Sequence, residues 1–321
     1  MVINELRMHP RHRCLGHVVT GSGYQTACIG KWHLWANQLG RQDDPRNSFP
    51  PRGHYSLGFD GFRASCGFHH EYWDAYYHAE SPEKILLHGD EPDGQTELAI
   101  RWLREERDPG TPFCMILSYE TPHDPWEREN VPEECWNKLA DVEFSYPGND
   151  REENDPSADA WGRFEPGERE RIPLWMRGYD AMTANRDGNF GRLLLAIADL
   201  GIAGDTIVVF SSDHGEIFGA HGRRAKTIVY DEAARVPLLM RWPDHVPAGA
   251  VQEAPRGTVD IMPTLLGLAA GHRGLRGRGG RPRVARPSRP ARGIGTTGSR
   301  IGSSGGPPRS RTSEDGRWSR D

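Results

Sequence analysis

The stretch 206–214, which reads TIVVFSSDH, contains the strongest strand signal in the chain. Its apolar run is continuous and rich in β-branched residues, which is typical of a strand covered on both faces. Asp213 and His214 follow the run directly. A polar pair at the end of a buried strand indicates an open α/β sheet, in which ligands bind beyond the carboxyl ends of the strands.

Two other apolar runs end in polar residues in the same way. The run 26–30 (TACIG) leads to Lys31 and His33, and the run 113–117 (FCMIL) leads into a proline-rich loop that contains His123. Because the carboxyl ends of parallel strands meet at one edge of a sheet, we expect these clusters to converge on a common site.

Helical patterns separate the apolar runs. Residues 96–107 (TELAIRWLREER) and 175–200 show helical spacing, and a shorter helix is predicted at 259–268. A fourth apolar run lies at 236–241. Strands that alternate with helices predict an α/β fold with a mostly parallel sheet sandwiched by helices.

Two long regions, 36–92 and 127–170, are rich in turn residues and lack a sustained period. We expect them to run over the surface and to shape the substrate pocket. Residues 1–20 also show no clear period and form an atypical N-terminal segment.

The segment 271–321 changes character and is dominated by Arg, Gly, Pro and Ser. From residue 272 onward it contains thirteen Arg and three acidic residues, although the whole chain has a formal net charge of -5. A segment with so few apolar residues is predicted to be disordered. It contains one aromatic residue, Trp318, and no RNA-binding module, so no nucleic-acid partner is expected.

The cysteines and the apolar runs restrict the class of protein further. None of the five cysteines forms a CxxC pair, so no zinc ribbon or disulfide framework is predicted. No run approaches the about 20 apolar residues that a membrane span needs. The first residues lack the apolar core of a signal peptide, and the compartment stays open.

The polar clusters have a chemical and an ordinary interpretation. Asp213 and His214 could bind a divalent cation, or they could be a helix N-cap beside a surface histidine. Lys31 and Lys226 could hold a tetrahedral oxyanion. His123, placed between two prolines, could be a rigid general acid. Taken singly, each of these residues also fits an ordinary surface position.

Four segments in order resemble the sulfatase family of the alkaline phosphatase superfamily. Residues 23–34 are similar to the signature G-Y-x-T-x-x-x-G-K-W-H, and residues 113–125 end in the family's P-H-x-P loop. Residues 206–237 match its S-D-H-G, H-G, Lys and Y-[ED]-E-x-x-R-V-P pattern, and residues 259–266 resemble its closing helix. The resemblance covers about residues 21–270, a partial catalytic domain.

The resemblance implies an alkaline-phosphatase-like fold and hydrolysis of a sulfate ester to an alcohol and sulfate. It implies that Lys31 and Lys226 bind the sulfate group. His33 would assist the nucleophile, and His123 would bind the substrate and protonate the leaving alcohol. The substrate would be a sulfated small molecule or carbohydrate.

The resemblance also implies a divalent cation, Ca²⁺ with Mg²⁺ as the alternative, bound by Asp213 and His214. The family's nucleophile is a formylglycine made in a C/S-x-P/A-x-R motif. Cys14 is followed by Leu-Gly-His-Val, so that motif is absent, and Glu5 stands alone where the family has a pair of acidic ligands.

The segment 271–321 also replaces the family's C-terminal subdomain. We therefore expect a truncated chain, and two alternatives stay open. One is a phosphonate or phosphate monoester hydrolase of the same superfamily, and the other is a sulfatase remnant without turnover.

Overall fold

The computed structural model describes residues 7–36, 47–66, 72–226 and 228–273. Except for its first three residues, the segment 271–321 with its predicted disorder lies outside the described residues.

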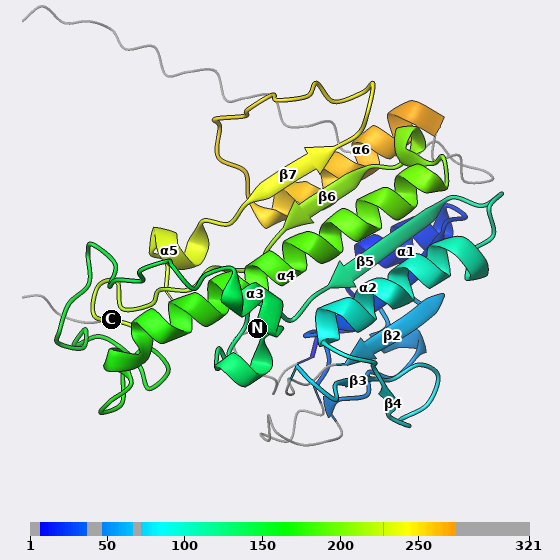
Figure 1. Ribbon diagram of the computed structural model, residues 1–321. Helices are drawn as coiled ribbons and strands as arrows, with labels where there is room; N and C mark the ends of the chain where they lie inside the picture. The colour runs from blue at the N-terminus through cyan, green and yellow to red at the C-terminus, as the bar shows by residue number, and fades with distance from the viewer. Residues whose placement is uncertain (1–6, 37–46, 67–71, 227, 274–321) are drawn as a thin grey trace, which may run out of the picture. The chain divides into compact units, whose positions relative to one another are not determined.

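The main sheet has three parallel strands in the order β2-β1-β5. They are β1 (Gln25–Lys31), β2 (Phe62–Cys66) and β5 (Phe113–Ser118). In the register of this sheet, Lys31 lies opposite Cys66 and Gly30 lies opposite Ser118. The predicted α/β class is confirmed, and the carboxyl ends of β1 and β5 meet at one edge (Figure 1).

Strand β2 lies inside the region 36–92, which was wrongly interpreted as a surface excursion throughout. Its sequence FRASC is short and carries an arginine, so no apolar run marks it. Arg63 is nevertheless only 4% exposed, and its guanidinium donates a hydrogen bond to the Pro50 carbonyl at 2.5 Å. A hydrogen-bonded guanidinium therefore occupies a position where sequence patterns favour an apolar residue.

Two helices cover one face of the sheet. They are α2 (Glu91–Arg101), which continues as a short π-helical turn, and α4 (Ile172–Asp199) (Figure 1). Ala27 and Ile29 of β1 pack into the apolar cluster that these helices share with the sheet. The intervening residue, Cys28, belongs to a second cluster with Trp32, Phe59 and other residues on the opposite face. This alternation follows the two-residue period of a strand.

Polar contacts hold α2 and α4 together at the end near the polar edge of the sheet. The side-chain amide of Asn185 donates to Asp90 Oδ2 at 2.6 Å, and that of Asn189 donates to Asp93 Oδ1 at 2.6 Å. Asp90 is 2% exposed, and burial, followed by the charge of Asp93, raises its pKa from 3.8 to about 7.

Asp90 should make the stability of the fold depend on pH. Its folded-state pKa is the higher one, so its contribution is complete below about pH 4 and is lost as the pH rises toward 7. We expect Asp90→Asn to gain stability relative to the unaltered chain between pH 5 and pH 8, by about 2–3 kcal/mol. Urea unfolding of both proteins at the two pH values measures this gain. A difference that does not change with pH would show that Asp90 titrates normally.

A second sheet pairs β6 (Val208–Ser211) with β7 (Leu238–Arg241) in antiparallel orientation. Phe210 of β6 lies 5.2 Å from Phe190 of α4, measured between ring centroids. In the described part of the chain no ladder joins this pair to the three-stranded sheet. Strand β6 is half-buried, so the expectation of cover on both faces is wrong.

The smaller elements complete the described chain. These are α1 (Leu15–Gly21), β3 (Tyr76–Tyr77), β4 (Ile85–Leu86), α3 (Glu133–Asn137), α5 (Asp231–Ala234) and α6 (Ile261–Arg273). Helix α1 lies in the N-terminal segment for which no period was found. Among the helices that the structure describes, none has both the length and the apolar character of a membrane span.

Candidate active site

The contact between His123 and Lys226 defines the centre of the candidate site. The Lys226 ammonium nitrogen lies 2.8 Å from His123 Nε2, although the two residues are 103 positions apart in the chain. His123 belongs to the loop that follows β5, and the peptide bonds before Pro122 and Pro125 are both cis. Lys226 follows β6 in the chain. Both residues were predicted from the sequence, and the structure brings them together.

Asp124 determines which nitrogen of the His123 ring carries the proton. Its carboxylate Oδ1 lies 2.7 Å from His123 Nδ1, and its carbonyl oxygen lies 3.0 Å from the same nitrogen. Nδ1 therefore carries a proton and donates it, which leaves Nε2 to accept a hydrogen bond from the Lys226 ammonium. No role was predicted for Asp124 from the sequence, although its place directly after the histidine was a usable signal.

The loop that carries His123 is held by two aromatic side chains. The Tyr72 hydroxyl donates to the His123 carbonyl at 2.7 Å, and the Trp126 indole donates to the Pro122 carbonyl at 2.8 Å. Both rings belong to the apolar cluster around the first half of α4. Burial therefore fixes the loop backbone, and with it the position of the imidazole.

Glu216 is a half-buried acid whose charge acts on Lys226. Burial raises the pKa of Glu216 to about 7, and the charge of Lys226 opposes this rise. Burial lowers the pKa of Lys226, while the negative charges of Glu216 and Asp124 raise it. These carboxyl groups favour the ammonium form of Lys226, which a sulfate-binding lysine requires.

His33 is neutral at physiological pH. Burial, followed by the positive charge of Lys31, lowers its pKa to about 4, while the charge of Asp213 acts in the opposite direction. Strand β1 includes Lys31 as its last residue, and His33 lies in the turn beyond it. Its Nε2 atom is buried and makes no hydrogen bond to any residue that the structure describes.

Two buried acids near Lys31 were missed by the sequence analysis. Glu91 is 1% exposed and Glu120 is 5% exposed. Burial raises the pKa of Glu91 well above its usual range, the charge of Glu120 raises it further, and Lys31 lowers it. Glu91 had been placed before the predicted helix, so its sequence context carried no sign of burial.

Asp213 and His214 alone do not fit a calcium ion. Their side chains approach to 3.4 Å between Asp213 Oδ2 and His214 Nε2, and that of Asp213 is 75% exposed. Calcium takes about six to eight oxygen ligands, whereas this pair supplies one carboxylate and one imidazole. Within the described residues no group of three or more His, Cys, Asp or Glu side chains could hold a metal.

Cys14 does not fit the nucleophile position. It lacks the motif that leads to formylglycine, and its thiol lies 3.6 Å from the His12 carbonyl. Burial raises its pKa, which disfavours the reactive thiolate. No catalytic step is therefore assigned to this residue.

The basic cluster after His221 has a structural role. Arg223 is 3% exposed and its guanidinium lies 3.0 Å from Asp155 Oδ2, while Arg224 pairs with Glu168. The His221 ring stacks on Tyr230 at 4.0 Å between centroids. Both arginine side chains are therefore paired with carboxylates of the chain itself.

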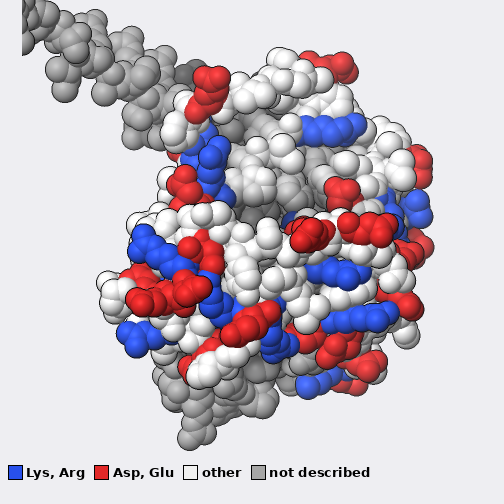
Figure 2. Space-filling view, turned by 60° about the vertical axis from the view of Figure 1, so that its left-hand side comes forward, with Lys and Arg blue, Asp and Glu red and all other residues white. Residues whose placement is uncertain are grey.

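Acidic and basic side chains are interspersed over the face of the molecule that Figure 2 shows. Mixed surface charges largely cancel beyond a Debye length of about 8 Å. The described side chains on this face therefore present no broad positive field to an anion.

A family model described as Sulfatase matches residues 7–272. This chain belongs to the sulfatase family. Sulfatases generally use a calcium ion and a formylglycine.

Two curated relatives come from bacteria. An ulvan-active sulfatase of Formosa agariphila is 31% identical over 272 residues, which is 84% of this chain and 48% of that protein. An N-acetylglucosamine-6-O-sulfatase of Bacteroides thetaiotaomicron is 27% identical over 310 residues, covering 77% of this chain and 52% of the relative. This chain therefore spans about half the length of the curated relatives it matches.

Solved structures share the fold. A protein in complex with its substrate D-glucosamine-2-N,6-O-disulfate superposes with a TM-score of 0.67 at 24% identity, covering 83% of this chain and 63% of that chain. A phosphonate monoester hydrolase of Silicibacter pomeroyi reaches a TM-score of 0.54 at 20% identity, covering 83% and 60%. The sulfatase interpretation holds, because the phosphonate hydrolases are the more distant neighbours.

Proposed function

We propose that this chain binds the sulfate ester of a carbohydrate at the Lys226–His123 pair and takes part in its hydrolysis. The 2.8 Å contact between these residues carries the proposal, because it places an ammonium donor and an imidazole at one point. The names of the bacterial relatives refer to ulvan and N-acetylglucosamine, which favours a carbohydrate over an aryl sulfate.

Each site residue has a role that follows from its surroundings. Lys226 donates to a sulfate oxygen, and Lys31 contributes a second positive charge at the end of β1. His123, when it is also protonated at Nε2, donates that proton to the bridging oxygen as the ester bond breaks and the alcohol leaves, and Asp124 holds the ring through Nδ1. His33 stays neutral and offers its Nε2 atom to the reacting group.

The first test compares ligands that differ only in the sulfate group. Calorimetric titration of the chain with N-acetylglucosamine 6-sulfate is expected to show binding, and titration with N-acetylglucosamine is expected to show none at the same concentrations. Equal affinity for the two sugars would overturn the proposal. Parallel assays with chromogenic aryl sulfate and aryl phosphate esters then report whether the chain turns over and which ester it prefers.

A further inference from the structure

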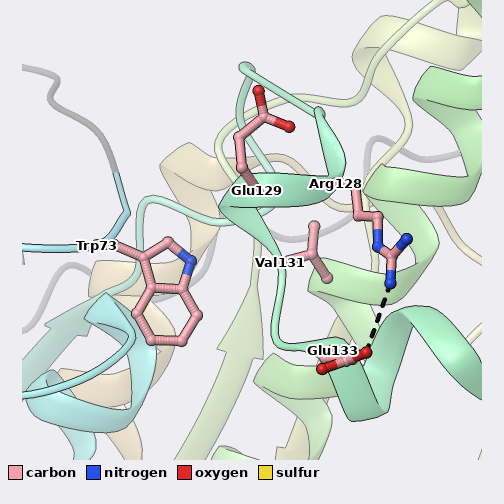
Figure 3. Close-up of a pocket in the computed structure, with 5 residues that line it drawn as sticks. All are labelled: Trp73, Arg128, Glu129, Val131 and Glu133. Carbon is pink, nitrogen blue, oxygen red and sulfur yellow. Dashed lines mark hydrogen bonds and ion pairs between the residues drawn. The ribbon is translucent and has the colours of Figure 1, made fainter.

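A pocket of about 480 Å³ lies between Trp73 and the segment Arg128–Glu133. Figure 3 shows the indole of Trp73 on one side of this pocket, and Arg128, Glu129, Val131 and Glu133 on the other. We propose that this pocket binds an uncharged sugar ring of the same carbohydrate, outside the sulfated unit. This inference rests on the proposed function for the identity of the sulfated unit.

Trp73 has the properties of a stacking platform. Its side chain is 41% exposed, so part of the ring is open to a ligand. Its backbone is held by an antiparallel bridge to Asp90, the buried residue that precedes α2. A large ring on a fixed backbone can stack on the apolar face of a sugar with little loss of conformational entropy.

The opposite wall supplies hydrogen-bonding groups around an apolar floor. Val131 is 4% exposed, and the residues around it are charged. The Arg128 guanidinium lies 3.5 Å from a carboxylate oxygen of Glu133, and both side chains are largely exposed. Carboxylates accept hydrogen bonds from sugar hydroxyls, and a guanidinium donates to ring or hydroxyl oxygens.

The charge of the pocket selects against a second sulfate. Arg128 is the only cation among the five lining residues, whereas Glu129 and Glu133 are both acidic. An anionic group placed here would meet more negative than positive charge and would lose its hydration. An uncharged sugar unit avoids this repulsion.

The pocket is physically linked to the candidate site. Tyr72, the residue before Trp73, donates its hydroxyl proton to the His123 carbonyl at 2.7 Å. Arg128 follows His123 by five residues, which is at most about 18 Å along an extended chain. Both walls of the pocket are therefore anchored at the loop that holds the catalytic imidazole, within reach of an oligosaccharide whose sulfate lies at Lys226.

Binding to two sulfated sugars tests the pocket. We expect the full chain to bind a disaccharide of N-acetylglucosamine 6-sulfate and unsulfated galactose about three- to tenfold more tightly than the monosaccharide sulfate. Trp73→Ala should abolish this advantage and leave the affinity for the monosaccharide unchanged. Trp73→Phe, which keeps an aromatic face, should retain part of the advantage.

Trp161→Ala is the matched control, because Trp161 is 52% exposed and does not line the pocket. The proposal is overturned if Trp73→Ala preserves the disaccharide advantage, if it weakens both ligands equally, or if the control has the same effect.

A second measurement does not depend on sulfate binding. In amide and indole NMR spectra, the Trp73 indole signal is identified as the one missing from Trp73→Ala. We expect the unsulfated disaccharide to shift this signal even in a Lys226→Met background. A shift without any sulfate binding would support the pocket while the proposed function fails. An unmoved Trp73 signal at saturating disaccharide would overturn the pocket itself.

Discussion

Replacing Lys226 with Met is expected to weaken the binding of N-acetylglucosamine 6-sulfate by about 10- to 100-fold. Met keeps the aliphatic stem of the side chain but removes the charge and the donor that lies 2.8 Å from His123 Nε2. A charge-assisted hydrogen bond in a partly buried site contributes about 1.5–3 kcal/mol, and each 1.4 kcal/mol corresponds to a tenfold change in affinity. Calorimetric titration of both proteins measures the loss.

Lys84→Met is the matched control for this substitution. Lys84 is exposed, and its ammonium lies over the ring of Tyr76, 4.0 Å from the centroid, outside the candidate site. We expect this variant to bind the sulfated sugar as tightly as the unaltered chain. If the two variants lose affinity equally, or if neither does, Lys226 is not the sulfate ligand.

Replacing Gly30 with Ala is expected to destabilise the fold by more than about 4 kcal/mol. Gly30 has a φ of +91°, and an added Cβ would lie 2.0 Å from the Ser118 carbonyl oxygen. Ser118 is its partner in the register between β1 and β5, so the two strands would have to separate. Because β5 leads into the loop of His123, sulfate binding should fall together with stability.

Gly23→Ala separates the two causes of the stability loss expected for Gly30→Ala, which are the left-handed backbone and the clash of the added Cβ with Ser118. Gly23 has a φ of +82°, but an added Cβ would meet nothing within 4 Å. Its cost should therefore be that of the left-handed backbone alone, about 1–2 kcal/mol. Urea unfolding of both variants measures the difference. Equal losses would show that the close approach of Ser118 does not matter.

Local sequence patterns were sufficient to predict a strand where an apolar run and the polar residues that follow it stand in one short segment. The runs 26–30, 113–117 and 206–212 were all predicted as strands, and the structure has a strand that overlaps each of them. Patterns failed where the burial of a charged residue depends on partners far away in the chain. Strand β2 was missed because Arg63 is buried against the Pro50 carbonyl. Glu91 was missed because the charges that act on it include Glu120 and Lys31, which are distant in the chain.

In the candidate site, too, local motifs identify the residues, whereas long-range contacts decide how they are arranged. The histidine at 123 and the lysine at 226 could be named from motifs, but nothing in either motif states that their nitrogens lie 2.8 Å apart. Asp124 selects the tautomer of His123 that this contact needs, because its carboxylate lies 2.7 Å from Nδ1. The pocket at Trp73 carries no sequence motif, since its walls are 55 or more positions apart.

The sequence by itself determined the family, the α/β class and the six candidate residues, because short motifs and hydrophobic periods are local properties of a chain. Tertiary structure alone decided which of these residues meet, which acids are buried beside the lysines, and where Trp73 presents its ring. Those properties depend on burial and on long-range contacts, and both exist only after the distant segments have packed together.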